Sequence, residues 1–299
     1  MSTAAAMSSL FNKKSKFGKY IFLLPAVSLL LLFFIFPIIL TVIFSFSNLS
    51  LTGSQSQNFR FIGLENYRQM LKDTQVFKSI VNTLIFLVCS SLIGQQVFGF
   101  LIAILMKNKN TIFRRVIGSI VLSGWVMPEV VCALCMANFL NDSGTLNSII
   151  KVFGGTPVLW LFKFPMLSII IANAWHGTAF SMLVYQSALD DVPTDIEEAA
   201  VVDGASNMAI LFKIILPNIK GSIITNMMLN TLSTLGVFGL IYMMTGGGPG
   251  DSTTTLPLLM YNDAFGSFQI GYGTAISMIL LTLGIILGVF YVKVSKVKI

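Results

Sequence analysis

The residues of this sequence that could do chemistry are polar side chains inside long apolar stretches. One stretch contains NAWHGTAFSM, and a helix would carry on one face its residues at spacings i, i+3, i+4 and i+7, namely Asn173, His176, Gly177 and Phe180. Another contains NTLSTLGVF, where the same spacing predicts a second face made of Asn230, Ser233, Thr234 and Val237. A third, SGWVMPEVV, holds Glu129, the only acid within any of the long apolar stretches.

These residue types suit the binding and passage of a polar solute. Amides and hydroxyls hydrogen-bond to solute hydroxyls, and aromatic rings cover apolar faces. Polar groups inside a membrane also serve as contacts between helices, so packing is the alternative for every residue named above. For Glu129 the alternatives are a hydrogen-bonded kink near Pro128 or pairing with a base on a second subunit.

Catalysis and metal binding have little support in the sequence. His176 is the only histidine, and no Ser-His-Asp set or pair of carboxylates is visible, so we expect neither a catalytic nor a metal site. The glycine-rich TGGGPGDS at 245–252 lacks the lysine of a phosphate-binding loop, so no nucleotide site is expected on this chain. Cys132 and Cys135 form a CxxC pattern without further ligands, which favours helix packing.

Long apolar helices must position these residues. The chain has 299 residues, of which 55% are hydrophobic and only 10% are charged. Stretches of about 18 or more apolar residues predict transmembrane helices, because a helix satisfies its own backbone within lipid. We predict an all-α polytopic membrane protein with one domain over 20–293 and tails at 1–19 and 294–299. Its six spans are expected at about 20–46, 79–106, 116–140, 164–189, 220–245 and 266–292.

Lysine and arginine set the expected orientation. With both termini placed inside the cell, thirteen of the 19 basic residues fall on inner segments. Inner loops carry the excess of Lys and Arg, so both termini and the connector between spans four and five are expected to be cytoplasmic. The net charge of +7 is then explained by orientation, and nucleic acid is not an expected partner.

That connector, residues 193–217, reads PTDIEEAAVVDGASNMAILFKIILP. Thr194 and Glu197 have the spacing of a capping box, which predicts the start of a short helix. Gly204 is expected to end it in a left-handed conformation, and Pro217 to end a second helical run. The residues alone leave a solvated amphipathic linker as an alternative.

The connector resembles the EAA motif of binding-protein-dependent ABC importer permeases. The match covers Glu198-Ala199-Ala200, then Asp203-Gly204-Ala205, then an apolar run that ends at Pro217. The resemblance implies the type I importer fold, in which this segment is a coupling helix that docks on an ATPase. The residues implied in coupling are Glu197, Glu198, Ala199, Ala200, Asp203, Gly204, Ala205 and Pro217.

Four further segments resemble the carbohydrate-uptake branch of that family: FIGLENYRQML at 61–71, NTLIF from Asn82, SGTLNSI at 143–149 and TGGGPGDSTTTLPLLMYNDAF at 245–265. The resemblance implies a sugar as substrate and a prokaryotic cell membrane as location, and the lack of cations in spans four and five favours a neutral oligosaccharide. Implied partners are a second permease subunit, an extracellular sugar-binding protein and a cytoplasmic ATPase dimer that holds ATP and Mg²⁺. It also places substrate contacts on the helices that carry Asn173 and Asn230.

Two alternatives remain at this point. One is an importer permease for another solute, such as glycerol phosphate. Its pathway would be expected to contain cationic side chains for the phosphate, and spans four and five have none. A self-contained secondary transporter would be expected to show paired broken helices and more intramembrane charge.

Overall fold

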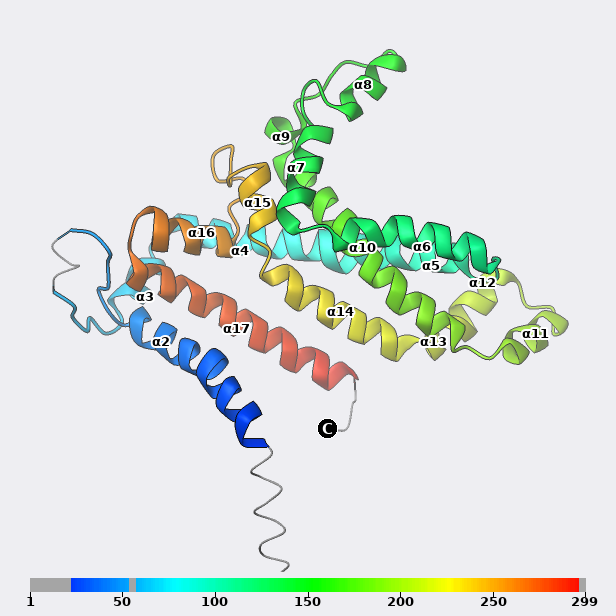
Figure 1. Cartoon of the computed structure of the whole chain (residues 1–299), viewed down its shortest axis with the longest axis horizontal. Helices are drawn as coiled ribbons and strands as arrows, with labels where there is room; N and C mark the ends of the chain where they lie inside the picture. The colour runs from blue at the N-terminus through cyan, green and yellow to red at the C-terminus, as the bar shows by residue number, and fades with distance from the viewer. Residues whose placement is uncertain (1–22, 54–57, 296–299) are drawn as a thin grey trace, which may run out of the picture.

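The computed structural model describes residues 23–53 and 58–295, and these form a helical body (Figure 1). Within them the sole β pairing is an isolated bridge between Ser47 and Phe61. The expected tail 1–19 lies outside the described residues, as does most of the tail 294–299. The all-helical class predicted from the apolar stretches is confirmed.

Four helices are long and apolar enough to cross a membrane: Leu23–Ser45, Thr74–Met106, Pro165–Asp190 (α10) and Ile270–Ser295 (α17). The first ends in α2 (Phe36–Ser45), and the second joins α4 (Thr74–Phe86) to α5 (Gln96–Met106) through a π-helical stretch, Leu87–Gln95. Two bent helix pairs raise the number of candidate spans to six.

The third span is not the single helix expected over 116–140. It consists of α6 (Thr111–Val126) and α7 (Glu129–Phe139), whose axes differ by 103°. Pro128 lacks a backbone N–H and disfavours helical geometry at the residue before it, and Met127 accordingly has a ψ of 137°. The chain therefore turns sharply inside the span.

The fifth span is broken as well, where one helix was expected over 220–245. The helix α14 (Lys220–Leu235) ends at Gly236, and the chain resumes helical geometry only in α15 (Gly239–Met244). Before α14, α12 (Asn207–Ile210) and α13 (Leu216–Asn218) form a unit bent from it by 69°. Irregular backbone at this depth needs buried partners or a cavity to line.

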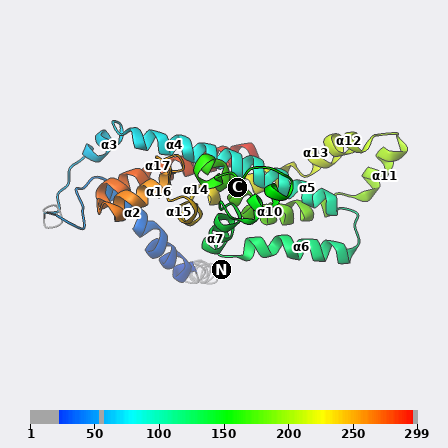
Figure 2. The ribbon, with the colours of Figure 1, turned by 90° about the horizontal axis from the view of Figure 1, so that it is seen from above.

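The remaining elements are short helices at the two ends of the body. The helix α11 (Thr194–Val202) lies at the opposite end from α3 (Glu65–Met70) in both views (Figures 1 and 2). Near the α3 end are α16 (Leu256–Tyr261) and a π-helical turn, Asn262–Gly266. Beyond α7 the chain forms α8 (Thr145–Val152) and α9 (Trp160–Lys163).

Buried asparagines hold the loops that carry the family-like motifs. Asn82 donates from Nδ2 to the carbonyls of Asp251 and Thr254, both 3.0 Å away. Asn66 donates to the carbonyls of Ser45 and Ser47, each 2.9 Å away. These amides donate to backbone carbonyls that regular secondary structure leaves without a partner. This explains why asparagine side chains are found at these positions.

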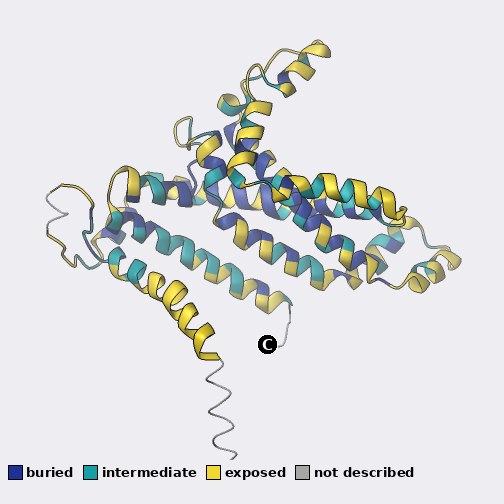
Figure 3. Cartoon of the chain, in the orientation of Figure 1, coloured by how far each residue is buried: buried dark blue, intermediate teal, exposed yellow. Residues whose placement is uncertain are grey.

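The body is built around α10, which packs along α5 and the preceding π-helical stretch. Figure 3 shows α10 as one of the most buried helices, whereas the first long helix, Leu23–Ser45, is exposed along most of its length. Glycines allow the close approach to α10. A Cβ on Gly99 would lie 2.4 Å from the Cβ of Ser181 and 2.9 Å from the backbone nitrogen of Met182, and one on Gly94 would lie 2.7 Å from the Cβ of Ala174.

Replacing Gly99 with alanine is expected to destabilise the subunit, because the added methyl group meets backbone and forces α5 away from α10. Overpacking of this kind costs about 1–3 kcal/mol. Thermal unfolding in detergent should show a lower melting temperature for Gly99→Ala. Gly118→Ala is the matched control, since its nearest neighbour would be the flexible end of Met106 at 3.8 Å. Equal melting temperatures for both variants would contradict the close packing at Gly99.

Candidate functional site

A cavity of about 220 Å³ lies where the two broken spans meet α10. Its walls come from the π-helical stretch before α5, from the α6–α7 break, from α10 and from the end of α14. The lining residues are Gln95, Trp125, Glu129, Asn173, His176, Gly177, Asn230, Ser233, Thr234, Gly236 and Val237.

The structure brings eight of the nine predicted path residues to this one cavity, and Phe180 is the exception. The ring of Phe180 packs behind Trp125, with 5.8 Å between ring centroids. Val237 lines the cavity for a different reason from the predicted one. It lies beyond the end of α14, so it shares no helical face with Asn230.

The sequence reasoning missed Gln95, Trp125 and Gly236. A signal existed for Gln95, because two adjacent glutamines, Gln95 and Gln96, interrupt the second apolar stretch. An uncharged amide in a span is expensive unless it is paired, so this pair could have been added to the candidates. Trp125 and Gly236 carry no comparable signal in a single sequence.

His176 supports the break between α6 and α7. Its Nε2 lies 3.2 Å from the carbonyl oxygen of Met127. A carbonyl only accepts hydrogen bonds, so Nε2 carries the proton in this contact. Met127 is the residue at which helical geometry stops, and His176 therefore satisfies a carbonyl next to the break. This contact accounts for a polar ring at this depth.

Glu129 joins the two broken spans. It is the first residue of α7, and its Oε1 accepts a hydrogen bond of 2.9 Å from the backbone N–H of Leu240 in the first turn of α15. A helix N-terminus has unpaired N–H donors and favours negative charge. The carboxylate thus holds α15 against α7, as the hydrogen-bonded alternative for this residue required, and it also borders the cavity.

The amides of the cavity are partly engaged in packing. Asn173 donates to the Ser90 hydroxyl at 2.8 Å, and Asn230 donates to the Ser181 hydroxyl at 2.7 Å. Gln95 donates to the carbonyl of Asn173 at 3.0 Å and crosses α10 at Gly177, where a Cβ would come within 2.2 Å of its amide nitrogen. Gly177 therefore makes room for Gln95.

Several other polar atoms of the lining have no such partner among the described residues. Within the described residues, no hydrogen bond is formed by the side-chain oxygens of Asn173 and Asn230 or by the hydroxyl of Ser233. The lining contains no lysine or arginine, and its one carboxylate is held by Leu240. The cavity can accept and donate hydrogen bonds without offering a cation to an anionic solute.

The connector has the bend expected at Gly204, where φ is +80°. The N–H of Ala205 bonds to the carbonyl of Ala200 at 2.9 Å, and that of Gly204 to the carbonyl of Val201 at 3.0 Å. These two bonds form a Schellman motif, whose left-handed residue is usually glycine. The left-handed end predicted for this helix is confirmed.

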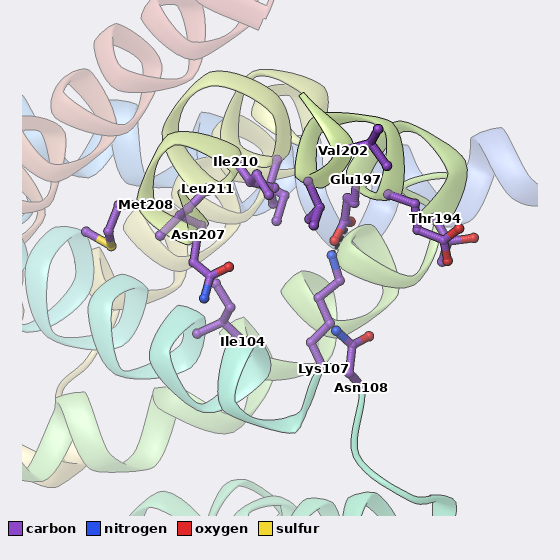
Figure 4. A pocket seen from close by; sticks show the side chains of 13 residues that line it. Ile104, Lys107, Asn108, Thr194, Glu197, Val202, Asn207, Met208, Ile210 and Leu211 are labelled. Atoms are coloured by element: carbon purple, nitrogen blue, oxygen red, sulfur yellow. Dashed lines mark hydrogen bonds and ion pairs between the residues drawn. The ribbon is translucent and has the colours of Figure 1, made fainter. Parts of the chain in front are cut away.

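The capping box predicted at the start of α11 is wrong. Pro193 is the N-cap residue, and no side chain caps the helix. Glu197 instead forms an ion pair with Lys107 at the end of α5, and both side chains are largely buried (Figure 4). A second ion pair, Arg114 with Asp190 at 2.5 Å, joins α6 to the end of α10. The pair between Glu197 and Lys107 therefore attaches the connector to the body.

The outer side of the connector is exposed. Glu198, Ala199, Asp203, Gly204 and Pro217 are exposed, whereas Ala200 and Ala205 are half-buried. Exposed apolar side chains accompany them, namely Ile196, Val201, Val202, Met208 and Phe212. A groove of about 860 Å³ separates α11 from α5 and α12 (Figure 4). Exposed apolar groups rimmed by acids are typical of a protein-docking surface.

At the other end of the body, burial and the nearby Asp73 raise the pKa of the Asp263 carboxyl from 3.8 to about 6. Because the folded pKa lies above the unfolded one, the folded state binds the proton more tightly. The stabilising contribution of Asp263 to the free energy of unfolding is present below about pH 4 and is lost as pH rises through about 6.

Asp263→Asn is therefore expected to flatten the pH dependence of the melting temperature between pH 4 and pH 7 and to raise the melting temperature at pH 7. Thermal unfolding of the detergent-solubilised subunit across this range provides the measurement. Asp142→Asn, on an exposed loop, serves as the control. If the melting temperature of Asp263→Asn depends on pH as that of the wild type does, Asp263 does not make this contribution.

The fold and the two sites define a polytopic membrane transport protein, with a polar cavity inside broken spans and an exposed connector at one end. The chain belongs to the family described as the binding-protein-dependent transport system inner membrane component, which matches residues 97–296. It is a permease subunit of the ABC importer class and has no ATPase site of its own; hydrolysis takes place on separate subunits.

Relatives match nearly the whole chain. The trehalose/maltose transport system permease protein MalF of Thermococcus litoralis is 32% identical over 97% of both chains. The multiple sugar-binding transport system permease protein MsmF of Streptococcus mutans is 32% identical over 94% of this chain and 96% of that protein. A solved bacterial alginate ABC transporter, in complex with an alginate pentasaccharide-bound periplasmic protein, shares the fold, with a TM-score of 0.81 at 22% identity over 95% of this chain and 96% of that one.

Proposed function

We propose that this chain forms one half of the membrane pathway of an importer that takes up a neutral oligosaccharide delivered by an extracellular binding protein. Residues 20–293 would form the permease domain in a prokaryotic cell membrane, with both termini in the cytoplasm. The gathering of eight candidate residues around one polar cavity carries the proposal. The sugar transport named for the relatives in Thermococcus litoralis and Streptococcus mutans supports the substrate class.

The cavity chemistry favours a neutral solute. A phosphorylated or acidic solute is usually met by Arg or Lys, and the lining has neither. The side-chain oxygens of Asn173, Asn230 and Ser233, which have no hydrogen-bond partner in the described part of the chain, suit sugar hydroxyls, and Trp125 offers a ring for an apolar sugar face. Glu129 contributes to the shape of the cavity through its bond to Leu240.

The connector is proposed as the contact to the ATPase. Glu198, Ala199 and Asp203 face outward on α11, next to exposed apolar side chains that a partner surface could cover. The ion pair between Glu197 and Lys107 attaches α11 to α5, so a displacement of the connector would be passed to the spans. A cytoplasmic ATPase dimer, with ATP and Mg²⁺ at its own sites, and a second permease subunit would complete the transporter.

Uptake by the complex reconstituted in liposomes tests this function. The complex of both permeases and the ATPase, supplied with a loaded binding protein and internal ATP, should accumulate a neutral labelled oligosaccharide. An acidic sugar and glycerol phosphate provide the comparison arms. Preference for an anionic solute would contradict the substrate class. Transport by this chain alone, without ATP, would contradict the importer.

Ser233→Ala should raise the solute concentration at half-maximal uptake, because it removes a hydroxyl that lines the cavity and has no partner among the described residues. One lost hydrogen bond of about 0.5–1.5 kcal/mol corresponds to a change of about twofold to thirteenfold. The measurement is initial uptake rate against the concentration of loaded binding protein and free sugar. Ser148→Ala, on the distant α8, is the control, and an unchanged half-saturation in Ser233→Ala would remove this residue from the path.

A further inference from the structure

An apolar surface that the other described residues leave exposed lies on the segment 145–164, here called the α8–α9 cap, which comprises α8, the following loop and α9. Figure 1 shows it beyond α7, away from the main body and far from α11. Val152 and Phe153 are 82% and 86% exposed, among the most exposed large apolar side chains of the described residues. The other exposed apolar residues of the cap are Ile149, Leu159, Phe162 and Phe164.

The cap is held in a defined conformation. The buried Asn147 accepts hydrogen bonds from the backbone N–H of Val158 at 2.9 Å and from the indole N–H of Trp160 at 3.3 Å. It also donates to the carbonyls of Val158 and Asn141, at 2.9 Å and 3.1 Å. One side chain thus joins α8 to the loop and to α9, so the apolar residues are presented in a fixed arrangement.

The charged residues of the cap itself are both basic. Between Asp142 and Asp190 the sequence contains no acid, and the cap carries Lys151 and Lys163. Lys151 adjoins Val152, and the Lys163 ammonium lies 5.5 Å from the centre of the Phe164 ring. The connector surface on α11, in contrast, combines apolar groups with acids. Apolar and aromatic side chains edged by lysines match the boundary between acyl chains and lipid phosphates.

Apolar side chains are also exposed on the helix that precedes the cap. The helix α7, from which the cap extends, exposes Val130, Val131 and Leu134 within a candidate span. An apolar face that continues past the end of a span reaches the interfacial region of the bilayer. We infer that the α8–α9 cap is an interfacial anchor: its apolar residues enter the outer edge of the acyl-chain region, and Lys151 and Lys163 contact lipid phosphates.

Fluorescence quenching in nanodiscs tests the inference on the complete transporter. An environment-sensitive fluorescent amino acid replaces Phe153 or, as a control, Ser148, an exposed polar residue in the first half of α8. The lipid is phosphatidylcholine with a fraction that carries a nitroxide near the top of one acyl chain. Quenching at 153 is expected to be severalfold stronger than at 148. If the probe at 153 prevents assembly, the equally exposed Val152 takes its place.

The outcomes separate lipid from protein partners. Equal, weak quenching at 153 and 148 would overturn the anchor, as would a probe at 153 that becomes shielded only when the loaded binding protein or the second permease is added. In a second arm, phosphatidylglycerol is added. It should increase the quenching at 153, and the double variant Lys151→Gln/Lys163→Gln should lose this increase. An increase that survives the double variant would overturn the phosphate contact.

Discussion

Replacing Gly204 with valine is expected to abolish most ATP-driven uptake, although the subunit still inserts and assembles. Gly204 has a φ of +80° at the end of α11, and no atom of the described residues lies within 4 Å of the position a Cβ would take. The expected effect therefore comes from the backbone alone. Left-handed geometry costs an L-residue about 1–2 kcal/mol, and more for a β-branched one.

That strain acts on the bend that directs α11. A penalty of about 1.4 kcal/mol lowers the population of the native bend about tenfold relative to its alternatives. The measurement is uptake together with ATPase activity of the reconstituted complex, with and without the loaded binding protein. Stimulation by the binding protein should disappear in Gly204→Val.

Two controls make this result specific. Gly204→Asn also adds a side chain, but asparagine tolerates a positive φ, so its uptake should stay close to wild type. Gly221→Ala, at an open position in the first turn of α14 without a positive φ, should transport normally. Normal uptake by Gly204→Val in an assembled complex would contradict the role of the connector. Failure of all three variants would indicate loss of folding instead.

Glu129→Ala is expected to reduce both stability and uptake strongly. The variant removes the acceptor of the Leu240 N–H and leaves this donor of α15 unpaired in a low-dielectric region. Loss of a charged partner to a buried N–H costs about 1.5–3 kcal/mol. Because α15 then loses its attachment to α7, the cavity wall at Gly236 and Val237 is expected to shift.

Thermal unfolding and uptake kinetics of three variants distinguish two roles of Glu129. It either holds α15 in position or contacts the solute directly. Glu129→Gln keeps an acceptor oxygen and should recover most of the melting temperature. If it also recovers the half-saturation for the sugar, Glu129 acts through the position of α15. A recovered stability with a raised half-saturation would instead indicate contact with the solute. Glu65→Ala, an exposed acid of α3, should match wild type. Wild-type stability in Glu129→Ala would contradict the proposal that Glu129 holds α15 against α7.

The sequence by itself determined the class of fold and most of the candidate residues. Apolar stretches that lack charge can satisfy their backbone in lipid only as helices, so composition was sufficient for the helical class of the fold. Polar residues such as Asn173 and Asn230 stand out against that background, because a polar group in a span needs a partner or a cavity. Gly204 was predictable too, since a left-handed helix end is a local property of the chain.

Only the tertiary structure decided which partners those residues contact. Helical spacing assigns residues to a face but does not say what lies opposite, so the placement of Phe180 behind Trp125 was missed. The breaks at Met127–Pro128 and at Gly236 turned the predicted straight spans into walls of a cavity. Their stabilising contacts are non-local: Glu129 reaches Leu240, 111 residues away, and Glu197 pairs with Lys107 rather than capping its own helix. Such partners depend on how the helices pack, and this packing cannot be deduced from the local sequence.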